Sequence, residues 1–229
     1  MIVNDVVTGI IAIIIAYLLG SIPAAYIVTR ILTGKDIRKL GGGNPGARNV
    51  FLEVGKAAGV GVGIFDMAKG VIAVVVAVWL LGAPSMTLID APETFQMFIL
   101  GAGLAAVVGH IWSVFLKFTG GNGLATSLGV LAFVMTWELL IAVAFVVLLA
   151  VFTRNLILSV NISLLTIPIS ALLTGKSWLF VVFAIALILV MVINFIPTAR
   201  AALASAGSGK NLSAELLRRD KDSKKKKRR

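Results

Sequence analysis

The stretch WLFVVFAIALILVMVINFI, residues 178–196, runs for nineteen residues without a charged side chain. A helix that crosses a bilayer needs about 20 consecutive, mostly apolar residues, so this stretch predicts a membrane span. Comparable runs recur along the chain, and 59% of its 229 residues are hydrophobic, whereas soluble domains have about 45–50% apolar residues. The sequence therefore predicts an all-α integral membrane protein.

The apolar runs divide into seven expected membrane helices. Five of them cover residues 6–29, 57–81, 95–116, 156–173 and 178–196. The long run 124–153 is interrupted by Trp137 and Glu138, and we divide it there into two short helices. An alternative with six helices keeps 124–153 as one long tilted span, because each half is short for a full crossing.

The distribution of charge orients these helices. Cytoplasmic loops of membrane proteins are enriched in lysine and arginine, and segment 30–56 carries six of these residues against two acids. With seven spans, the N-terminus then lies outside and the C-terminus inside. We expect no cleavable signal peptide, because the first apolar run is too long and no basic segment precedes it.

The last thirty residues differ from the rest. We expect residues 1–200 to form one membrane domain and residues 201–229 a disordered cytoplasmic tail. The tail ends in RRDKDSKKKKRR, and such a cationic run is attracted to anionic lipid, which we favour over binding to nucleic acid. The chain has no cysteine, which excludes disulfides and thiolate chemistry.

Two glycine-rich loops are expected on the inner face. KLGGGNPGARNV covers residues 39–50, and FTGGNGLAT covers residues 118–126, where it opens an apolar helix. Successive backbone N–H groups in glycine loops can form a concave nest for phosphate, and a helix N-terminus adds positive potential. The alternative to a phosphate site is that the glycines serve only to make these turns tight. Arg154 stands at the next inner turn, so three inner segments could converge on one anion site.

The spaced motifs resemble those of the bacterial acyl-phosphate:glycerol-3-phosphate acyltransferases. GSIPAAYIVTRILTGKDIRKLGGGNPGARNV, residues 20–50, resembles the first family motif, which reads GSIP, then DIR, then GSGNxGATN. FDMAKG, residues 65–70, resembles the D-x-x-K-G of the second helix. GHIWSVFLKFTGGNGLAT, residues 109–126, resembles the motif that contains G-G-K-G. The resemblance covers residues 20–130 well and the remaining helices loosely.

The resemblance implies a bacterial plasma-membrane enzyme with its active face in the cytoplasm. It would move an acyl group from acyl phosphate to glycerol 3-phosphate and so give lysophosphatidic acid, a step of phospholipid biosynthesis, without a metal or a cofactor. Gly42, Arg48 and Asn122 stand where the family has serine, threonine and lysine, and the family's histidine after the last helix is absent. A catalytically degenerate paralogue that binds lipid or a protein partner is therefore the alternative.

The candidate residues follow from the loops and the resemblance together. Asn44, Arg48 and Asn49 are the candidates for catalysis. The expected phosphate-binding set is Gly41, Gly42, Gly43, Asn44, Gly46, Arg48, Asn49, Gly120, Gly121, Asn122, Gly123, Thr126 and Arg154. We expect structural roles for Asp66 and Lys69, which lie three residues apart on one helix face and can pair, and for His110, which can hydrogen-bond the second glycine loop.

Overall fold

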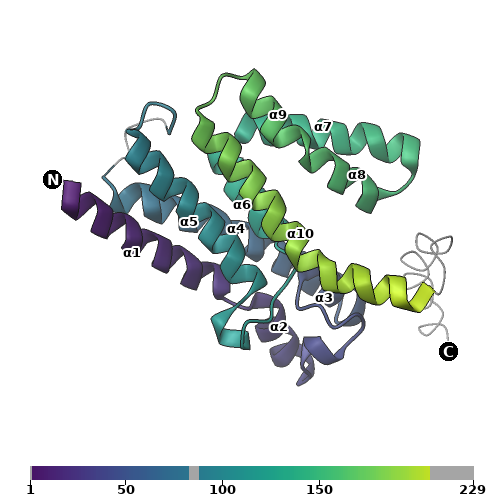
Figure 1. Ribbon diagram of the computed structural model, residues 1–229. Coiled ribbons are helices and arrows are strands. Elements are labelled where there is room, and N and C mark those ends of the chain that lie inside the picture. Colours follow the sequence, from purple (N-terminus) through teal and green to yellow (C-terminus); the bar gives the residue numbers. More distant parts are fainter. Residues whose placement is uncertain (1, 83–87, 207–229) are drawn as a thin grey trace, which may run out of the picture. The chain divides into compact units, whose positions relative to one another are not determined.

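The computed structural model describes residues 2–82 and 88–206, and all regular secondary structure within these ranges is helical (Figure 1). Its α-helices are α1 Ile2–Ser21, α2 Ala24–Thr33, α3 Ala47–Glu53, α4 Lys56–Leu80, α5 Glu93–Ile111, α6 Leu124–Val134, α7 Thr136–Thr153, α8 Leu156–Leu164, α9 Thr166–Leu173 and α10 Trp178–Ala206. Two short 3-10 turns, η1 Ile37–Lys39 and η2 Val114–Leu116, lie in the loops. The chain divides into two compact units, residues 1–190 and residues 191–229, and α10 begins in the first unit.

Five helical segments in the described ranges are long and apolar enough to cross a membrane. They are Asn4–Thr33, Lys56–Leu80, Glu93–Leu116, Thr136–Thr153 and Trp178–Pro197, and two further apolar segments, Leu124–Val134 and Leu158–Leu173, are shorter. Large apolar side chains are exposed on these helices, among them Phe152 at 77%. Water would penalise such exposure, whereas lipid does not, so the fold is that of an all-helical membrane protein.

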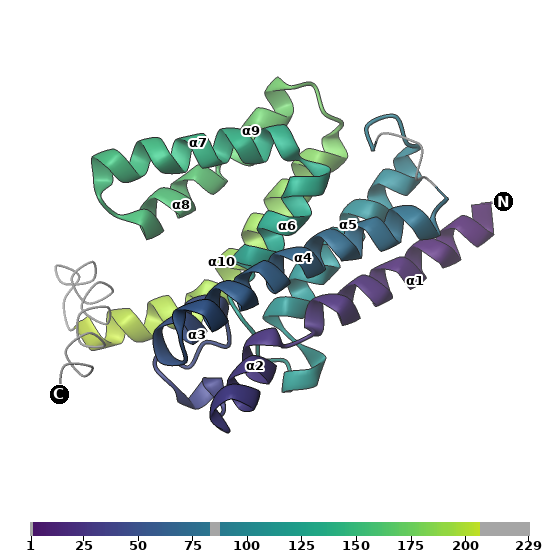
Figure 2. The same ribbon diagram turned by 180° about the vertical axis from the view of Figure 1, so that it is seen from behind.

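The first expected span is present as the apolar segment Asn4–Thr33, but its helix is broken at Ile22 and Pro23. α1 ends at Ser21 and α2 begins at Ala24. Proline has no backbone N–H and disfavours helical backbone in the residue before it, so a helix commonly ends there. The break turns the chain away from α1 into a loop region that contains η1 and α3 (Figure 2).

The run 124–153 does contain two helices, and the break between them lies at Met135, just before Trp137 and Glu138. Met135 has non-helical backbone between α6 and α7. Glu138 is not a loop charge in the structure, because its side chain is fully buried. Its Oε1 accepts a hydrogen bond from the Thr174 hydroxyl at 2.9 Å, and Lys176 Nζ lies 3.7 Å from its Oε2. This cluster joins the start of α7 to the segment that leads into α10.

Glycine allows the central helices to pack with their backbones in contact. A Cβ on Gly20 would overlap the Ala106 carbonyl, which brings α1 against α5. A Cβ on Gly70 would overlap the Thr126 carbonyl, and one on Gly129 the Met67 carbonyl, which brings α4 against α6. Small residues at such crossings are the usual means of close helix packing in membranes. The packing brings the ends of α1 and α5 to the start of α6.

Candidate functional site

The first glycine loop takes backbone conformations that favour glycine. Gly41 has φ 53° and Gly43 has φ 74°, a region that other residues rarely adopt. The Gly42 N–H donates to Asn49 Oδ1 at 3.3 Å, and the Gly43 N–H donates to the Leu40 carbonyl at 2.9 Å. Two of the backbone N–H groups that were expected to bind phosphate therefore make hydrogen bonds within the loop itself.

Asn49 holds this loop from inside. Its side chain is buried, and its Nδ2 donates to the carbonyls of Ile37 at 3.3 Å and Leu40 at 3.0 Å. Together with the hydrogen bond that it accepts from the Gly42 N–H, the Asn49 side-chain amide therefore connects three backbone positions of the loop region. Asn49 was expected to orient a substrate, and the structure instead places its amide on loop backbone.

Asn44 and Arg48 lie at the surface of the same loop. Asn44 is partly buried, and its carbonyl accepts a hydrogen bond from the Gly46 N–H at 2.9 Å. Arg48 is exposed in the first turn of α3, directly after Gly46. The guanidinium can therefore reach an anion at the surface of the loop, and it carries up to five N–H donors for that purpose.

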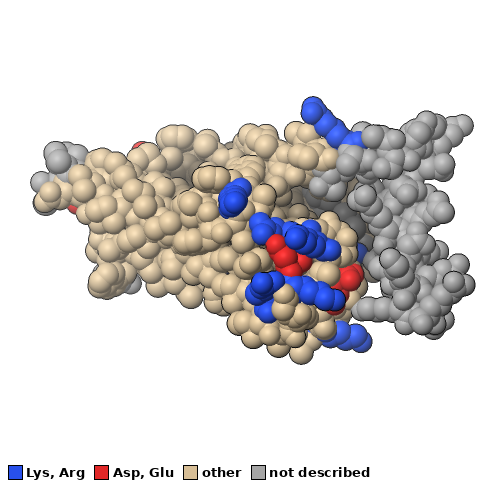
Figure 3. All heavy atoms as spheres, turned by 90° about the horizontal axis from the view of Figure 1, so that it is seen from below, with Lys and Arg blue, Asp and Glu red and all other residues tan. Residues whose placement is uncertain are grey.

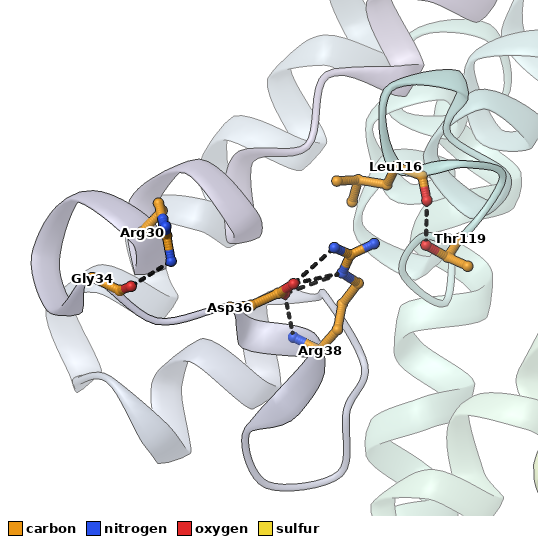
Figure 4. A network of polar contacts seen from close by, with 6 residues as sticks. All are labelled: Arg30, Gly34, Asp36, Arg38, Leu116 and Thr119. Carbon is orange, nitrogen blue, oxygen red and sulfur yellow. Dashed lines mark hydrogen bonds and ion pairs between the residues drawn. The ribbon is translucent and has the colours of Figure 1, made fainter.

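Another arginine of the region, Arg38, is paired with Asp36. Its guanidinium contacts both carboxylate oxygens of Asp36, the shortest N–O distance being 2.7 Å, and it lies 5.4 Å from the centre of the Tyr26 ring. The hydrogen bond from Arg38 lowers the pKa of Asp36. Figure 4 shows the Arg38 side chain extending from Asp36 toward the turn formed by Leu116 and Thr119.

The second glycine loop leads directly into α6, as the sequence predicts. Gly123, with φ 83°, caps the helix, and Asn122 beside it is exposed. The Gly121 N–H donates to the His110 carbonyl at 3.1 Å. A Cβ on Gly120 would overlap this same carbonyl, and one on Gly121 would overlap the His110 ring. His110 therefore lies directly against the loop and determines its position.

A buried ion pair lies next to this loop. Lys69 Nζ lies 2.9 Å from Asp66 Oδ1, and His110 Nδ1 lies 3.5 Å from the same oxygen. Lys69 Nζ also donates to the Ile22 carbonyl at 3.0 Å, in the turn between α1 and α2. Buried charges in proteins are paired, and here the Asp66–Lys69 pair links that turn to α4 and, through His110, to the second glycine loop.

Residues from both loops, from the turn between α1 and α2 and from α4 line one small cavity, here named the motif cavity. Its wall consists of Ser21, Ile22, Pro23, Ala24, Pro45, Asp66, Lys69, His110, Ser113, Leu116, Gly120 and Gly121. Both glycine loops therefore contribute to one cavity, which also includes Asp66 and Lys69 of the D-x-x-K-G segment but not Arg154, the third segment that the sequence predicted to converge here.

Sequence reasoning missed Ser21 and Ser113 as members of the cavity wall. The Ser113 hydroxyl donates to the Ser21 carbonyl at 2.6 Å, and the buried Ser21 hydroxyl has no hydrogen-bond partner within the described part of the chain. The only available signal was the position of Ser21 inside GSIP. Two other expected residues lie elsewhere. Thr126 is fully buried where α6 packs on α4, and Arg154 is exposed at the turn between α7 and α8, which Figures 1 and 2 both show apart from α2 and α3.

The surface around the loops is strongly charged. Figure 3 shows most of the visible Lys, Arg, Asp and Glu side chains gathered in one area of the face seen from below. The exposed members of segment 30–56 are Arg30, Lys35, Arg38, Lys39, Arg48, Glu53 and Lys56. A predominance of cations beside a cavity attracts anionic ligands.

The fold and the motif cavity define a helical membrane protein whose glycine loops and surrounding cations suit a phosphate-bearing ligand. The family profile described as "Glycerol-3-phosphate acyltransferase" matches residues 10–204. "Glycerol-3-phosphate acyltransferase 1" of Dehalococcoides mccartyi is 38% identical over 218 residues, which cover 93% of this chain and 100% of the relative. "Glycerol-3-phosphate acyltransferase" of Endomicrobium trichonymphae is 42% identical over 180 residues, covering 79% and 84%.

A solved structure is similar over most of its length. PlsY (YgiH), an integral membrane glycerol 3-phosphate acyltransferase in its glycerol 3-phosphate form, has a TM-score of 0.72 and 28% sequence identity, with 86% of this chain and 92% of that chain covered. The lysophosphatidic acid form of the same enzyme gives a TM-score of 0.70. This chain belongs to the glycerol-3-phosphate acyltransferase family.

Proposed function

We propose that this protein transfers an acyl group from acyl phosphate to glycerol 3-phosphate at the motif cavity and its loops. The observation that carries the proposal is that residues from all three family-like segments line one cavity. Both substrates carry a phosphate, and two glycine loops with an exposed arginine suit two phosphates. The unpartnered Ser21 hydroxyl supports a polar occupant, because buried hydroxyls are normally hydrogen-bonded.

The reaction needs alignment more than covalent help from the protein. A glycerol hydroxyl oxygen bonds to the acyl carbonyl carbon, the bond from that carbon to the phosphate oxygen breaks, and phosphate leaves with the electron pair. The hydroxyl proton passes to a phosphate oxygen. Fixing the two reactants side by side converts a bimolecular step into an effectively unimolecular one, and cations beside the phosphates stabilise the developing negative charge.

We assign the substrate contacts to groups that the loops leave exposed. Arg48, Asn44 and Asn122 lie at the loop surfaces, so we propose them for phosphate or hydroxyl binding, with Gly41 to Gly46 and Gly120 to Gly123 as the surrounding backbone. Arginine can bind a phosphate through two hydrogen bonds at once, so Arg48 takes over part of the positive charge of the family lysine that Asn122 replaces.

Arg48→Ala tests this assignment, with Lys35→Ala as the matched control because Lys35 is also exposed and stands outside the glycine loop. Loss of one charged hydrogen-bonding group of about 1.5–3 kcal/mol should raise the KM for glycerol 3-phosphate by roughly 10- to 100-fold. Lys35→Ala should leave it unchanged. Equal KM values in the parent and Arg48→Ala would exclude Arg48 from binding.

The alternative of a degenerate paralogue is not favoured. The relatives named as acyltransferases align over nearly the whole chain, and the glycine backbone of both loops is kept although Gly42, Arg48 and Asn122 differ from the family pattern. Release of phosphate from acyl phosphate, dependent on glycerol 3-phosphate, separates the two functions directly. A parent protein that binds both substrates without turnover would establish the paralogue.

We further propose seven membrane crossings with the motif cavity on the cytoplasmic side. The five long helices and the two shorter apolar segments together make seven, and the cations of segment 30–56 support an inner loop. A reporter that works only in the cytoplasm should therefore be active when it is fused after Arg229, and one that works only in the periplasm should be inactive there. Residues 201–206, which we expected to begin the disordered tail, instead belong to α10, and the remaining basic tail, residues 207–229, which we expect to contact anionic lipid, lies outside the described residues.

A further inference from the structure

The outer face of α2 combines exposed apolar side chains with an exposed cation. The inner face of the helix is buried and consists of Ala24, Ala25 and Thr29. Ile27 and Ile31 lie one turn apart on the outer face, where Ile31 is 76% exposed. Arg30 is exposed beside them, and its Nη1 donates to the Gly34 carbonyl at 2.5 Å. Water penalises the exposed isoleucines and hydrocarbon penalises the arginine, so this face suits the boundary between the two.

The turn that follows α5 presents the same kinds of side chain. Phe115 and Phe118 are both exposed, Phe118 at 63%, and Lys117 between them is exposed as well. Lys117 and Phe118 have φ values of 57° and 59°, a backbone region that glycine adopts more readily than other residues. Because neither side chain is buried, packing does not explain why two residues other than glycine stand here. A role of the exposed side chains themselves does explain it.

α2 and this turn are neighbours. Pro23 and Ala24, where α2 begins, line the motif cavity together with Leu116 of the turn. Figures 1 and 2 show the loop after α5 beside α2 from both sides. The two segments therefore provide one surface next to the cavity, here named the α2–turn surface, which consists of Ile27, Arg30, Ile31, Phe115, Lys117 and Phe118.

We propose that the α2–turn surface binds the headgroups of anionic phospholipids. Residues 24–35 and 113–119 include no acid, and neither Arg30 nor Lys117 forms an ion pair within the described part of the chain. Cations near a membrane surface attract anionic lipid, and both residue types bind phosphate.

The apolar side chains identify a lipid, and not free phosphate, as the occupant. Isoleucine and phenylalanine beside a cation can contact the upper part of the acyl chains while the cation contacts the headgroup. Free phosphate or glycerol 3-phosphate has no apolar part that would cover them. The proposal does not depend on the proposed function, because no substrate of the acyl transfer takes part in it.

Trp112 is a suitable probe, because it lies between the end of α5 and the turn. It becomes the only tryptophan when Trp79, Trp137 and Trp178 are changed to phenylalanine. This parent protein is placed in phosphatidylcholine nanodiscs that contain an equal fraction of either brominated phosphatidylglycerol or brominated phosphatidylcholine. Bromine quenches a nearby indole, so the fluorescence reports which lipid gathers at the surface. We expect stronger quenching by the phosphatidylglycerol.

Arg30→Gln combined with Lys117→Gln should remove this difference. One cation near the surface contributes a factor of about five to the affinity for anionic lipid, so the loss of both should weaken it by roughly 25-fold. Lys39→Gln combined with Lys56→Gln is the matched control, because both lysines are exposed outside the surface and the net charge falls equally. This control should keep the parent's difference.

Lys117→Gly covers the case in which the double variant does not fold, since glycine suits the backbone at this position. It should reduce the preference for phosphatidylglycerol by about fivefold. Equal quenching by the two lipids in the parent, or a difference that survives in the double variant, would overturn the proposal.

A second copy of the chain is the competing occupant of the surface. The chain has no cysteine, so Ile31→Cys introduces a single thiol on the exposed face of α2. We expect this variant to stay monomeric when it is oxidised in the nanodiscs or in the native membrane. A disulfide-linked dimer formed in the native membrane would assign the surface to the second copy and overturn the lipid assignment.

Discussion

Removing the charge of Asp66 should destabilise the protein and also slow acyl transfer. Asp66 and Lys69 are only 2% and 4% exposed, and their closest N–O distance is 2.9 Å. In Asp66→Asn the Lys69 ammonium stays buried with the Ile22 carbonyl as its remaining described partner. Breaking a buried pair by removing one charge costs about 3–5 kcal/mol. At about 2–4 °C per kcal/mol for chains of this size, the Tm in detergent should fall by roughly 6–20 °C.

The chain offers a matched control in the buried pair of Glu138 and Lys176. Here the N–O distance is 3.7 Å, the lysine side chain is 10% exposed, and its Nζ also lies 4.8 Å from the centre of the Phe180 ring. In Glu138→Gln the amide oxygen can still accept the hydrogen bond from Thr174. We therefore expect a smaller loss, about 1–3 kcal/mol, and no specific effect on turnover, because no residue of this pair lines the motif cavity.

A double variant separates stability from positioning. Replacing a buried ion pair with apolar residues is often neutral for stability, so Asp66→Leu combined with Lys69→Met should recover much of the lost Tm. It should not recover kcat, because the Ile22 carbonyl and His110 lose the partners that hold them against the cavity. A misplacement of about 1 Å can cost on the order of 100-fold in rate. Parent-like kcat in the folded double variant, or a larger Tm loss in Glu138→Gln than in Asp66→Asn, would refute the reasoning.

Three further outcomes follow from the loops. Gly121→Ala should lower both Tm and activity, because the new Cβ would overlap the His110 ring, whereas Gly42→Ala should keep the parent Tm, since nothing lies within 4 Å of a Cβ there. Asn49→Asp should cost about 1–3 kcal/mol and raise the KM for glycerol 3-phosphate, because a carboxylate cannot donate to the Ile37 and Leu40 carbonyls; an unchanged melting curve would contradict this. The lowered pKa of Asp36 means that its stabilising pairing with Arg38 is present above the unfolded pKa of about 3.9 and is lost as the pH falls through the lower folded value. Acid-unfolding curves of the parent and Asp36→Asn should therefore differ most above pH 4 and converge below it.

Local patterns were sufficient to predict most helices, and their limits explain the errors. Apolar runs locate the cores of the long helices because lipid accepts apolar side chains at every position of a span. Hydrophobicity is insensitive to backbone direction, however, so the apolar composition of run 6–29 does not indicate that α1 and α2 separate near Pro23. The one signal of the break within this run is Pro23 itself. For the same reason the run 178–196 did not indicate that α10 continues to Ala206, with Pro197 inside the helix.

Tertiary contacts account for what the sequence could not predict about the site. Nothing in the sequence pairs Glu138 with Lys176, because they are 38 positions apart, and only the fold brings their side chains together. Asparagine is a residue type that suits substrate binding, and only the folded loop shows that the Asn49 side-chain amide is hydrogen-bonded to the backbone of Ile37, Leu40 and Gly42. Asp66 and Lys69 were predictable as a pair, since a spacing of three places both on one helix face.

The glycine contacts between α4 and α6 have a consequence for how the protein tolerates change. At Gly70 and Gly129 one helix touches the backbone of the other, so no side chain at these points can rotate or shorten to absorb a substitution. The two helices are therefore expected to move as a single rigid body during lipid exchange, and the start of α6 keeps its distance from Asp66 and Lys69. A methyl group added at either glycine must separate the two helices along their shared length, which would make these two remote positions as intolerant of exchange as any residue that touches substrate.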